Sequence, residues 1–235
     1  MKNKKSNLLI FPLLIVAIIL VFLIFVILNY IMDRFVMPKD YLFYETSVIP
    51  TKLFIFVTMF LVIILLSVIL NKFKINKIDK FEVYVDFWKK YKYIYLVIFM
   101  LILYAFLNTI TIVTKDKIIY KDIFHPKGIN YKYNDVSKVE TGFGKKRLTL
   151  IDYNRRGEFY YRIYFDNKDF TFSVPSVNEN IEKYRNDTYL ELEEFDSKLM
   201  EYDIEKVSDN ENSKYCILDK VYCDRFVRIV NNKGE

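Results

Sequence analysis

Three long apolar runs constrain this chain more than any other feature of its sequence. They are Leu8–Leu28, Leu53–Leu70 and Tyr93–Val113, and none of them contains Asp, Glu, Lys, Arg or His. An α-helix rises about 1.5 Å per residue, so about 20 apolar residues cover the roughly 30 Å hydrocarbon core of a bilayer. Residues 1–113 are therefore predicted to form three transmembrane helices, and residues 114–235 a soluble domain.

A cleaved secretory signal is the alternative interpretation of the first run, since Lys2, Lys4 and Lys5 precede it. The apolar part of a signal peptide has about 7–15 residues and is followed by small residues at the cleavage site. The first run is longer and lacks such a site, which favours a membrane span. The absence of ionisable residues from the spans also argues against a stand-alone channel or pump.

The net charge of +6 is divided unevenly between the two parts. Residues 1–113 carry a net charge of +7, and residues 114–235 a net charge of −1. A nucleic-acid-binding domain would need its basic excess on the soluble part, so nucleic acid is not an expected partner. Basic residues that flank apolar spans suit the headgroups of a lipid bilayer, the expected partner. Another membrane protein is a further candidate.

The basic residues near the spans also predict the topology. The N-terminus and the second loop together hold ten Lys or Arg, and the first loop holds three. Because cytoplasmic loops carry the excess, the N-terminus is predicted to be cytoplasmic and the C-terminal domain extracytoplasmic. If the four lysines that follow Val113 are counted with the first loop, the predicted cytoplasmic side has ten basic residues and the other side has seven. The aromatic first loop, Phe35–Tyr44, is expected to rest on the membrane surface or to cover the base of the soluble domain.

The soluble part opens with runs that have the character of β-strands. Apolar and polar residues alternate most clearly in Phe159–Phe165, as in a half-buried strand. The turn signals His125–Gly128 and Asp166–Asp169 separate neighbouring runs. These patterns predict an antiparallel β-meander of five to seven strands. The other runs are Lys117–Phe124, Ile129–Tyr133, Val136–Phe143, Leu148–Tyr153 and Phe170–Val174.

After Pro175 the apolar residues recur at helical spacing. Ser176 and Thr188 are each followed three residues later by Glu, which is a capping-box pattern. The second helix would pack an apolar stripe on the sheet, with Asp196 and three glutamates placed where they suit the helix dipole. A polar break at Ser208–Lys214 precedes a last helix, marked by Leu218, Val221, Tyr222, Phe226 and Ile229. The predicted fold class is a membrane α-helical half followed by an α+β domain.

A sheet of antiparallel strands that follows a membrane span and is closed by helices resembles the bacterial pleckstrin-homology-like domains attached to transmembrane segments. The resemblance covers Thr114–Val174, particularly Lys117–Phe124, the connection Tyr133–Val139 and Phe159–Val174. It implies a function in binding or assembly and no catalysis.

Five basic residues are the candidate lipid- or anion-binding residues. They are Lys145, Lys146, Arg147, Arg155 and Arg156, near the two ends of one short predicted strand. They could form a single basic edge that faces lipid headgroups or an anionic polymer; alternatively, they are solvated charges in turns. The glycines at 142 and 144 could help a loop to hold phosphate, but a full phosphate-binding motif is lacking and a hairpin tip is the simpler interpretation.

The remaining chemistry-bearing residues do not predict a catalytic or metal site. His125 is the only histidine and lies in a proline turn, so no metal ligand set and no cofactor are expected. Cys216 and Cys223 would lie about 10 Å apart on one helix, too far for a disulfide. They could pair only if Cys216 precedes the helix and the chain folds back. Buried thiols and an extracytoplasmic disulfide therefore remain as alternatives.

These observations predict a multi-pass protein of the bacterial cell membrane whose C-terminal domain is a membrane-proximal binding or assembly module. Its Lys, Asn, Ile and Tyr usage suits an AT-rich bacterial genome. An accessory or immunity subunit of a membrane transport or toxin system is the alternative. A membrane-anchored enzyme is a third, which would need a pocket with paired carboxylates or a nucleophile and base.

Overall fold

The computed structural model describes residues 2–72, 79–145, 155–173, 176–177 and 189–232. The chain forms two compact units. The helical unit comprises Met1–Met37, Thr46–Thr109 and Asp122–Phe124, and the β-rich unit comprises Pro38–Glu45, Ile110–Lys121 and His125–Glu235. Both units are thus assembled from segments that are separate in the sequence.

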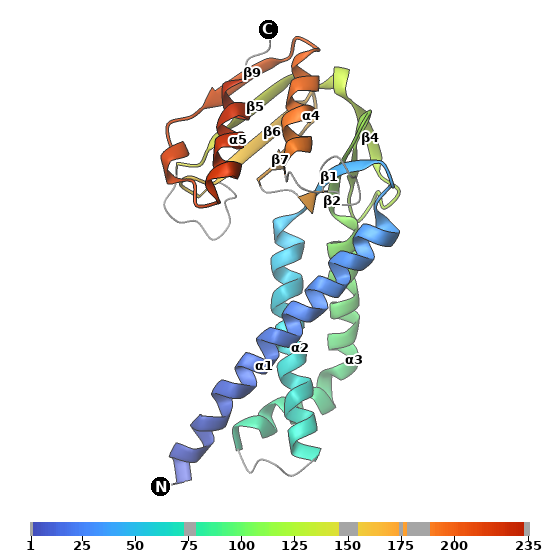
Figure 1. Ribbon diagram of the computed structural model, residues 1–235. Helices are drawn as coiled ribbons and strands as arrows, with labels where there is room; N and C mark the ends of the chain where they lie inside the picture. Colours follow the sequence, from blue (N-terminus) through green and yellow to red (C-terminus); the bar gives the residue numbers. More distant parts are fainter. Residues whose placement is uncertain (1, 73–78, 146–154, 174–175, 178–188, 233–235) are drawn as a thin grey trace. The chain divides into compact units, whose positions relative to one another are not determined.

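Among the described residues, three long helices form the helical unit (Figure 1). Each contains a segment that is long and apolar enough to cross a membrane: Leu14–Val36, Val48–Leu70 and Val83–Asn108. The prediction of three long apolar helices is therefore confirmed. The helices are α1 (Lys2–Ile31), which continues into the π-helix η1 (Met32–Val36), α2 (Val48–Lys72) and α3 (Asp79–Asn108).

Aromatic side chains pack the three helices together. Phe54 of α2 stacks on Phe106 of α3 with ring centroids 4.7 Å apart, and Phe25 of α1 lies 6.0 Å from Phe106. The Tyr95 hydroxyl of α3 donates a hydrogen bond to the Val57 carbonyl of α2, at 2.5 Å. The first glycine of the sequence is Gly128, so glycine contacts of the GxxxG type cannot bring these helices together. Large rings pack α3 against α1 and α2, and a smaller aliphatic cluster of Ala17, Val21 and Val62 packs α1 against α2.

The third apolar run ends earlier than its composition predicts. Helix α3 ends at Asn108, and Ile110–Thr114 forms strand β2. The extension of the third span to Val113 is therefore wrong. Apolar residues continue without a break because both a membrane helix and a buried strand are apolar, and periodicity does not separate the two. The β-branched residues of β2 favour the strand, which pairs with β3 (Lys117–Lys121).

The first loop neither rests on the membrane surface nor covers the base of the soluble domain, the two places that its aromatic residues suggest. Tyr41–Thr46 forms strand β1, in which Tyr41–Tyr44 are buried. It lies inside a five-stranded sheet with the order β4-β3-β2-β1-β8. The remaining strands of this sheet are β4 (Ile129–Lys132) and β8 (Ser176–Val177). The segment between the first two apolar helices is thus a structural part of the β-rich unit.

Among the residues that the structure describes, a second sheet has four strands in the order β7-β6-β5-β9. Strand β6 shows the strict alternation of buried and half-buried residues that its sequence predicts. The pair β5–β9 is parallel, so the expectation of a purely antiparallel meander is wrong at this edge. The strands are β5 (Lys138–Phe143), β6 (Phe159–Phe165), β7 (Lys168–Phe172) and β9 (Glu205–Asp209). The predicted strand Leu148–Tyr153 lies outside the described residues.

Helices α4 and α5 pack in the described part of the β-rich unit (Figure 1). Helix α4 (Leu190–Met200) begins after Tyr189, which has the left-handed φ of 67°, and helix α5 (Lys220–Asn231) is the predicted C-terminal helix. Ser176 does not begin a helix, because it lies in β8 and pairs with Tyr44 of β1. Thr188 lies outside the described residues, and the residue before α4 makes no side-chain cap.

Strand β9 occupies residues that the sequence assigned partly to a polar break. Its sequence Glu-Lys-Val-Ser-Asp has one aliphatic residue and is largely exposed, so it carries little strand pattern of its own. Pairing with β5, from Lys138↔Glu205 to Gly142↔Asp209, makes it a strand. A tertiary interaction therefore decides its structure.

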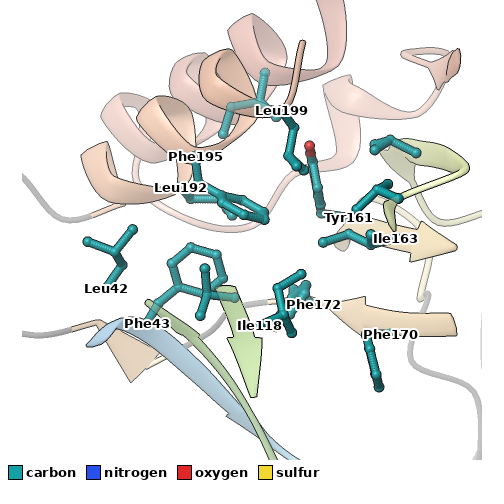
Figure 2. Packing of buried hydrophobic residues seen from close by; sticks show 14 of the residues in the cluster. Leu42, Phe43, Ile118, Tyr161, Ile163, Phe170, Phe172, Leu192, Phe195 and Leu199 are labelled. Carbon is teal, nitrogen blue, oxygen red and sulfur yellow. The ribbon is translucent and has the colours of Figure 1, made fainter. Parts of the chain in front are cut away.

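Phe43 of β1 is fully buried in the core of the β-rich unit (Figure 2). Its ring meets Phe172 of β7 edge-on at 5.3 Å and Phe195 of α4 at 5.4 Å. In the same core, Phe159 of β6 stacks on Phe226 of α5, with ring centroids 4.1 Å apart. The core therefore joins both sheets to both helices, and one of its buried rings comes from the first loop.

Candidate functional site

Three of the five predicted anion-binding residues lie at one end of the β5–β6 hairpin. Lys145 follows β5, whereas Arg155 and Arg156 precede β6. Backbone hydrogen bonds join these segments, since Gly157 donates to the Gly144 carbonyl at 3.1 Å and Gly144 donates to the Glu158 carbonyl at 2.9 Å. Lys146 and Arg147, the other two predicted residues, lie outside the described residues.

Acidic neighbours partly compensate the charge of Lys145. Its ammonium group lies 2.6 Å from the Asp209 carboxylate and 3.9 Å from that of Glu211. The hydrogen bond to Asp209 raises the pKa of Lys145, and the same contact lowers the pKa of Asp209. Lys145 is therefore held by the end of β9 and is a weaker candidate for binding an external anion than its sequence context predicts.

The two arginines belong to a turn that packs on a distant part of the chain. The Arg156 guanidinium lies over the ring of Tyr215, 3.6 Å from its centroid. Gly157 has a φ of +81°, and a β-carbon there would clash with the Tyr215 carbonyl group. Only glycine allows this approach. We call Arg155–Gly157 the arginine turn.

A disulfide between Cys216 and Cys223 closes the segment that follows Tyr215. Cys216 precedes α5 and Cys223 lies in its first turn, so their α-carbons are 6.1 Å apart. This is the folded-back arrangement that pairing requires, and the alternative of buried free thiols is wrong. The disulfide loop, Cys216–Cys223, presents Ile217 with 90% of its surface exposed and Val221 with 63% exposed.

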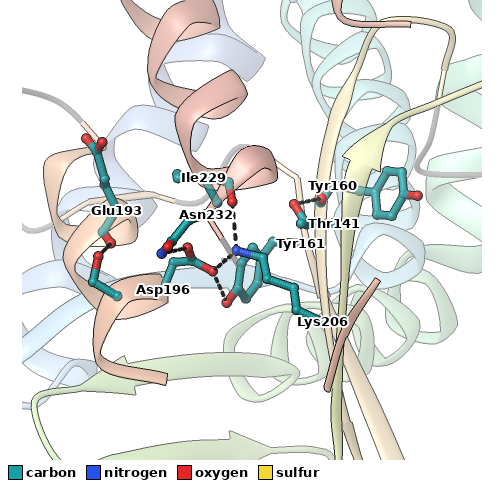
Figure 3. Close-up of polar contacts among 9 residues, drawn as sticks. Thr141, Tyr160, Tyr161, Glu193, Asp196, Lys206, Ile229 and Asn232 are labelled. Atoms are coloured by element: carbon teal, nitrogen blue, oxygen red, sulfur yellow. Dashed lines mark hydrogen bonds and ion pairs between the residues drawn. The ribbon is translucent and has the colours of Figure 1, made fainter. Parts of the chain in front are cut away.

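A buried polar cluster lies near the C-terminal end of α5, and the sequence does not reveal it (Figure 3). The Asp196 carboxylate of α4 accepts hydrogen bonds from Lys206 at 2.5 Å, the Tyr161 hydroxyl at 2.8 Å and the Asn232 amide at 2.8 Å. Lys206 also donates to the Ile229 carbonyl, at 2.7 Å. The Lys206 and Asp196 side chains are 3% and 1% exposed. Their ionic groups are thus withdrawn from water.

The sequence places Asp196 among the acids that suit the helix dipole. In the structure its side chain is instead buried in this cluster. Burial raises the pKa of Asp196 and lowers the pKa of Lys206, while the attraction between the two charges opposes both shifts. The hydrogen bonds of this cluster are made between protein groups. The arrangement can therefore orient α4, β9 and the end of α5, and it does not present its charges to a substrate. No spacing rule could have paired residues 10 positions apart across a helix and a strand.

Glu45, at the end of β1, is a second acidic residue with an unusual environment. It is half-buried, and its carboxyl oxygen accepts a hydrogen bond from the Ser173 amide at 2.9 Å. Burial raises the pKa of Glu45 to about 8, opposed by the Ser173 hydrogen bond and helped by the nearby charge of Glu158. Glu45 is therefore protonated near neutral pH and can exchange a proton in the physiological range.

Comparison of the chain with protein-family models, with curated proteins and with solved structures finds no significant match. Among the residues that the structure describes, no group of three or more His, Cys, Asp and Glu side chains is arranged to hold a metal ion. The arrangements that carry a functional argument are therefore the arginine turn and the disulfide loop, together with the apolar helices.

Replacement of Lys206 by Met tests the structural role of the buried cluster. This change leaves the Asp196 carboxylate buried without its charged partner, which is expected to lower the free energy of unfolding by roughly 3–5 kcal/mol. The double variant Lys206→Met/Asp196→Asn should lose less free energy of unfolding than the sum of the losses in the two single variants. Urea unfolding of the full chain in detergent, followed by near-ultraviolet circular dichroism, measures both.

The matched control for Lys206→Met is Lys220→Met at an exposed position, which should change stability by less than about 0.5 kcal/mol. Equal effects of the two Lys→Met changes would contradict the assigned role.

Glu45 predicts a pH dependence of stability. An unfolded Glu releases its proton near pH 4.5, whereas folded Glu45 retains it up to about pH 8. The free energy of unfolding should therefore decrease as the pH rises between these values, because only the unfolded state gains from proton release. Glu45→Gln should reduce this slope, as measured by unfolding midpoints across the range. The exposed Glu205→Gln serves as control; a slope equally steep in Glu45→Gln and in the original chain would refute the prediction.

Proposed function

We propose that this chain is a multi-pass protein of the bacterial cell membrane, with the N-terminus in the cytoplasm and the β-rich unit outside. Three long apolar helices support insertion in a bilayer. The Cys216–Cys223 disulfide supports the orientation, because structural disulfides persist in oxidising compartments and are rare in the cytosol. The lysine and arginine distribution supports the same orientation independently.

The β-rich unit serves in this proposal as a binding or assembly module of the pleckstrin-homology-like kind. Its two sheets and helices enclose one apolar core, which supports a rigid scaffold rather than a mobile linker. The observation that carries the proposal is the disulfide loop, where Ile217 is almost fully exposed beside the arginine turn. Exposed apolar residues on a constrained loop are typical of contact surfaces.

The composition of this surface favours a protein partner. Arginine and tyrosine are enriched where protein interfaces derive most of their binding energy, and here Arg156 is already stacked on Tyr215. A disulfide that fixes the loop lowers the entropy lost on binding. The disulfide loop, the two residues before it and the arginine turn carry more basic residues than the acids Asp219 and Asp224. The basic residues are Arg155, Lys214 and Lys220, which are exposed, and Arg156, which is half-buried. The expected partner is therefore an extracytoplasmic or membrane protein with an acidic rim around an apolar contact.

A photoreactive amino acid at position 217 of the full chain, expressed in its native cells, tests this function. Illumination should give one discrete adduct that mass spectrometry identifies as an extracytoplasmic or membrane protein. Arg156→Glu should remove the adduct without unfolding the β-rich unit, because it reverses the charge next to the apolar contact. Arg156→Lys keeps the charge and should retain part of the yield.

Tyr202 provides the control position for cross-linking, since it is 46% exposed in the same unit and lies outside the disulfide loop. The proposal fails if position 217 gives no adduct, or if position 202 gives the same adduct with similar yield.

A further inference from the structure

The turn between β3 and β4 belongs to the helical unit, although its flanking strands belong to the β-rich unit. The helical unit includes Asp122–Phe124, which follows the last residue of β3. The Tyr104 hydroxyl of α3 donates a hydrogen bond to the Ile123 carbonyl, at 3.3 Å. The turn therefore lies beside the last turns of α3. We call Asp122–Phe124 the hairpin tip.

The position of Tyr104 along α3 gives the depth of this contact. The candidate span Val83–Asn108 has 26 residues. Asp86, Lys89, Lys90 and Lys92 lie in its first part, and the uncharged part that follows, residues 93–108, is about 24 Å long at about 1.5 Å per residue. A bilayer with its headgroups is about 40–45 Å thick, and its hydrocarbon core about 30 Å. Tyr104 precedes Asn108 by one turn, or about 6 Å. Tyr104 is thus expected near the boundary between headgroups and hydrocarbon, where tyrosine side chains are enriched.

The hairpin tip has the chemistry of an interfacial segment. Ile123 is 43% exposed and Phe124 is 81% exposed, so two neighbouring apolar side chains face outward. The Asp122 carboxylate accepts a hydrogen bond from the Phe124 amide at 2.9 Å, which orders the turn locally. Lys121 and Lys127 flank the apolar pair in the sequence and could reach anionic headgroups.

Aromatic residues at the end of the first helix support the same assignment. Tyr30 of α1 and Phe35 of η1 are 66% and 78% exposed. In a three-span arrangement, the C-terminal ends of α1 and α3 lie on the same side of the membrane. Tyr30, Phe35 and Tyr104 would then belong to one aromatic belt at one lipid interface.

We propose that the hairpin tip inserts Ile123 and Phe124 into the lipid interface of the bilayer that holds α1, α2 and α3. The ligand of this surface is phospholipid, contacted by the apolar pair and by the flanking lysines. The inference rests on the proposed function only in requiring that the three helices span the membrane. It assigns a lipid-contacting role to a turn whose sequence resembles an ordinary hairpin loop.

Depth-dependent quenching of a single tryptophan tests the inference in the full chain. Trp88 is the only tryptophan, so Trp88→Phe gives a tryptophan-free background. In that background, Phe124→Trp reports on the hairpin tip, Leu101→Trp on the middle of the uncharged part of α3, residues 93–108, and Ile217→Trp on the disulfide loop. Each variant is reconstituted in vesicles of phosphatidylcholine and phosphatidylglycerol, with bromine on shallow or on deep acyl carbons, and is titrated with iodide in the aqueous phase.

The Phe124→Trp variant is expected to show a blue-shifted emission that shallow bromines quench more than deep ones, with little quenching by iodide. The Leu101→Trp variant should be quenched most by deep bromines, and the Ile217→Trp variant by iodide alone. Ile123→Trp provides a second reporter if Phe124→Trp does not fold, as judged by its circular dichroism.

Two outcomes would overturn the inference. One would leave the proposed membrane spanning intact, and the other would refute it too. Suppose that iodide quenches the Phe124→Trp variant as strongly as the Ile217→Trp variant, while deep bromines still quench the Leu101→Trp variant. This result would refute lipid insertion of the tip alone and would indicate water or a protein partner there. If bromine quenched neither the Leu101→Trp nor the Phe124→Trp variant, the proposed membrane spanning would fail as well.

Discussion

The carboxylate of Asp196 is the point on which the architecture of the β-rich unit depends most. It accepts hydrogen bonds from β6, from β9 and from the residue that follows α5. A buried carboxylate without these donors would lose its hydration and gain nothing in return, so the elements that carry the donors must stay in place. Strand β9 has little apolar surface of its own, and Lys206 joins it to Asp196 of α4 and to the Ile229 carbonyl of α5. The parallel β5–β9 edge is therefore held by a buried ion pair in addition to backbone pairing.

The sequence predicted those parts of the fold in which local pattern and tertiary environment agree. The three apolar helices, the strand Phe159–Phe165 and the C-terminal helix follow from length and periodicity. The predictions are wrong where the same sequence pattern is compatible with two different structures. Residues 110–113 are apolar enough to extend a membrane helix, yet they pair as β2. The first loop has aromatic residues that suit a membrane surface, yet Phe43 is fully buried in the core.

In the candidate site too, the sequence predicted contacts between nearby residues and missed contacts with residues far away in the chain. Sequence position alone brought the arginine turn and Lys145 to one end of a hairpin, and backbone hydrogen bonds join these segments. It could not show that Asp209 pairs with Lys145, or that Arg156 lies on Tyr215, because these partners come from β9 and from a turn about 60 residues away. Because of these contacts, the basic edge is a weaker candidate binding surface than the disulfide loop. The loop is both constrained by its disulfide and rich in exposed apolar surface.

The compartment of the β-rich unit is the claim on which the proposed function depends, and the chain's two cysteines test it directly. Intact cells are treated with a membrane-impermeant maleimide, with or without prior treatment with an impermeant reductant, and a lysed and denatured sample shows complete labelling. An extracytoplasmic unit with a disulfide should be labelled in intact cells only after reduction, and a variant with both cysteines replaced by serine should not be labelled at all. Labelling that requires lysis even after the reductant would place the unit in the cytoplasm and contradict the proposed orientation.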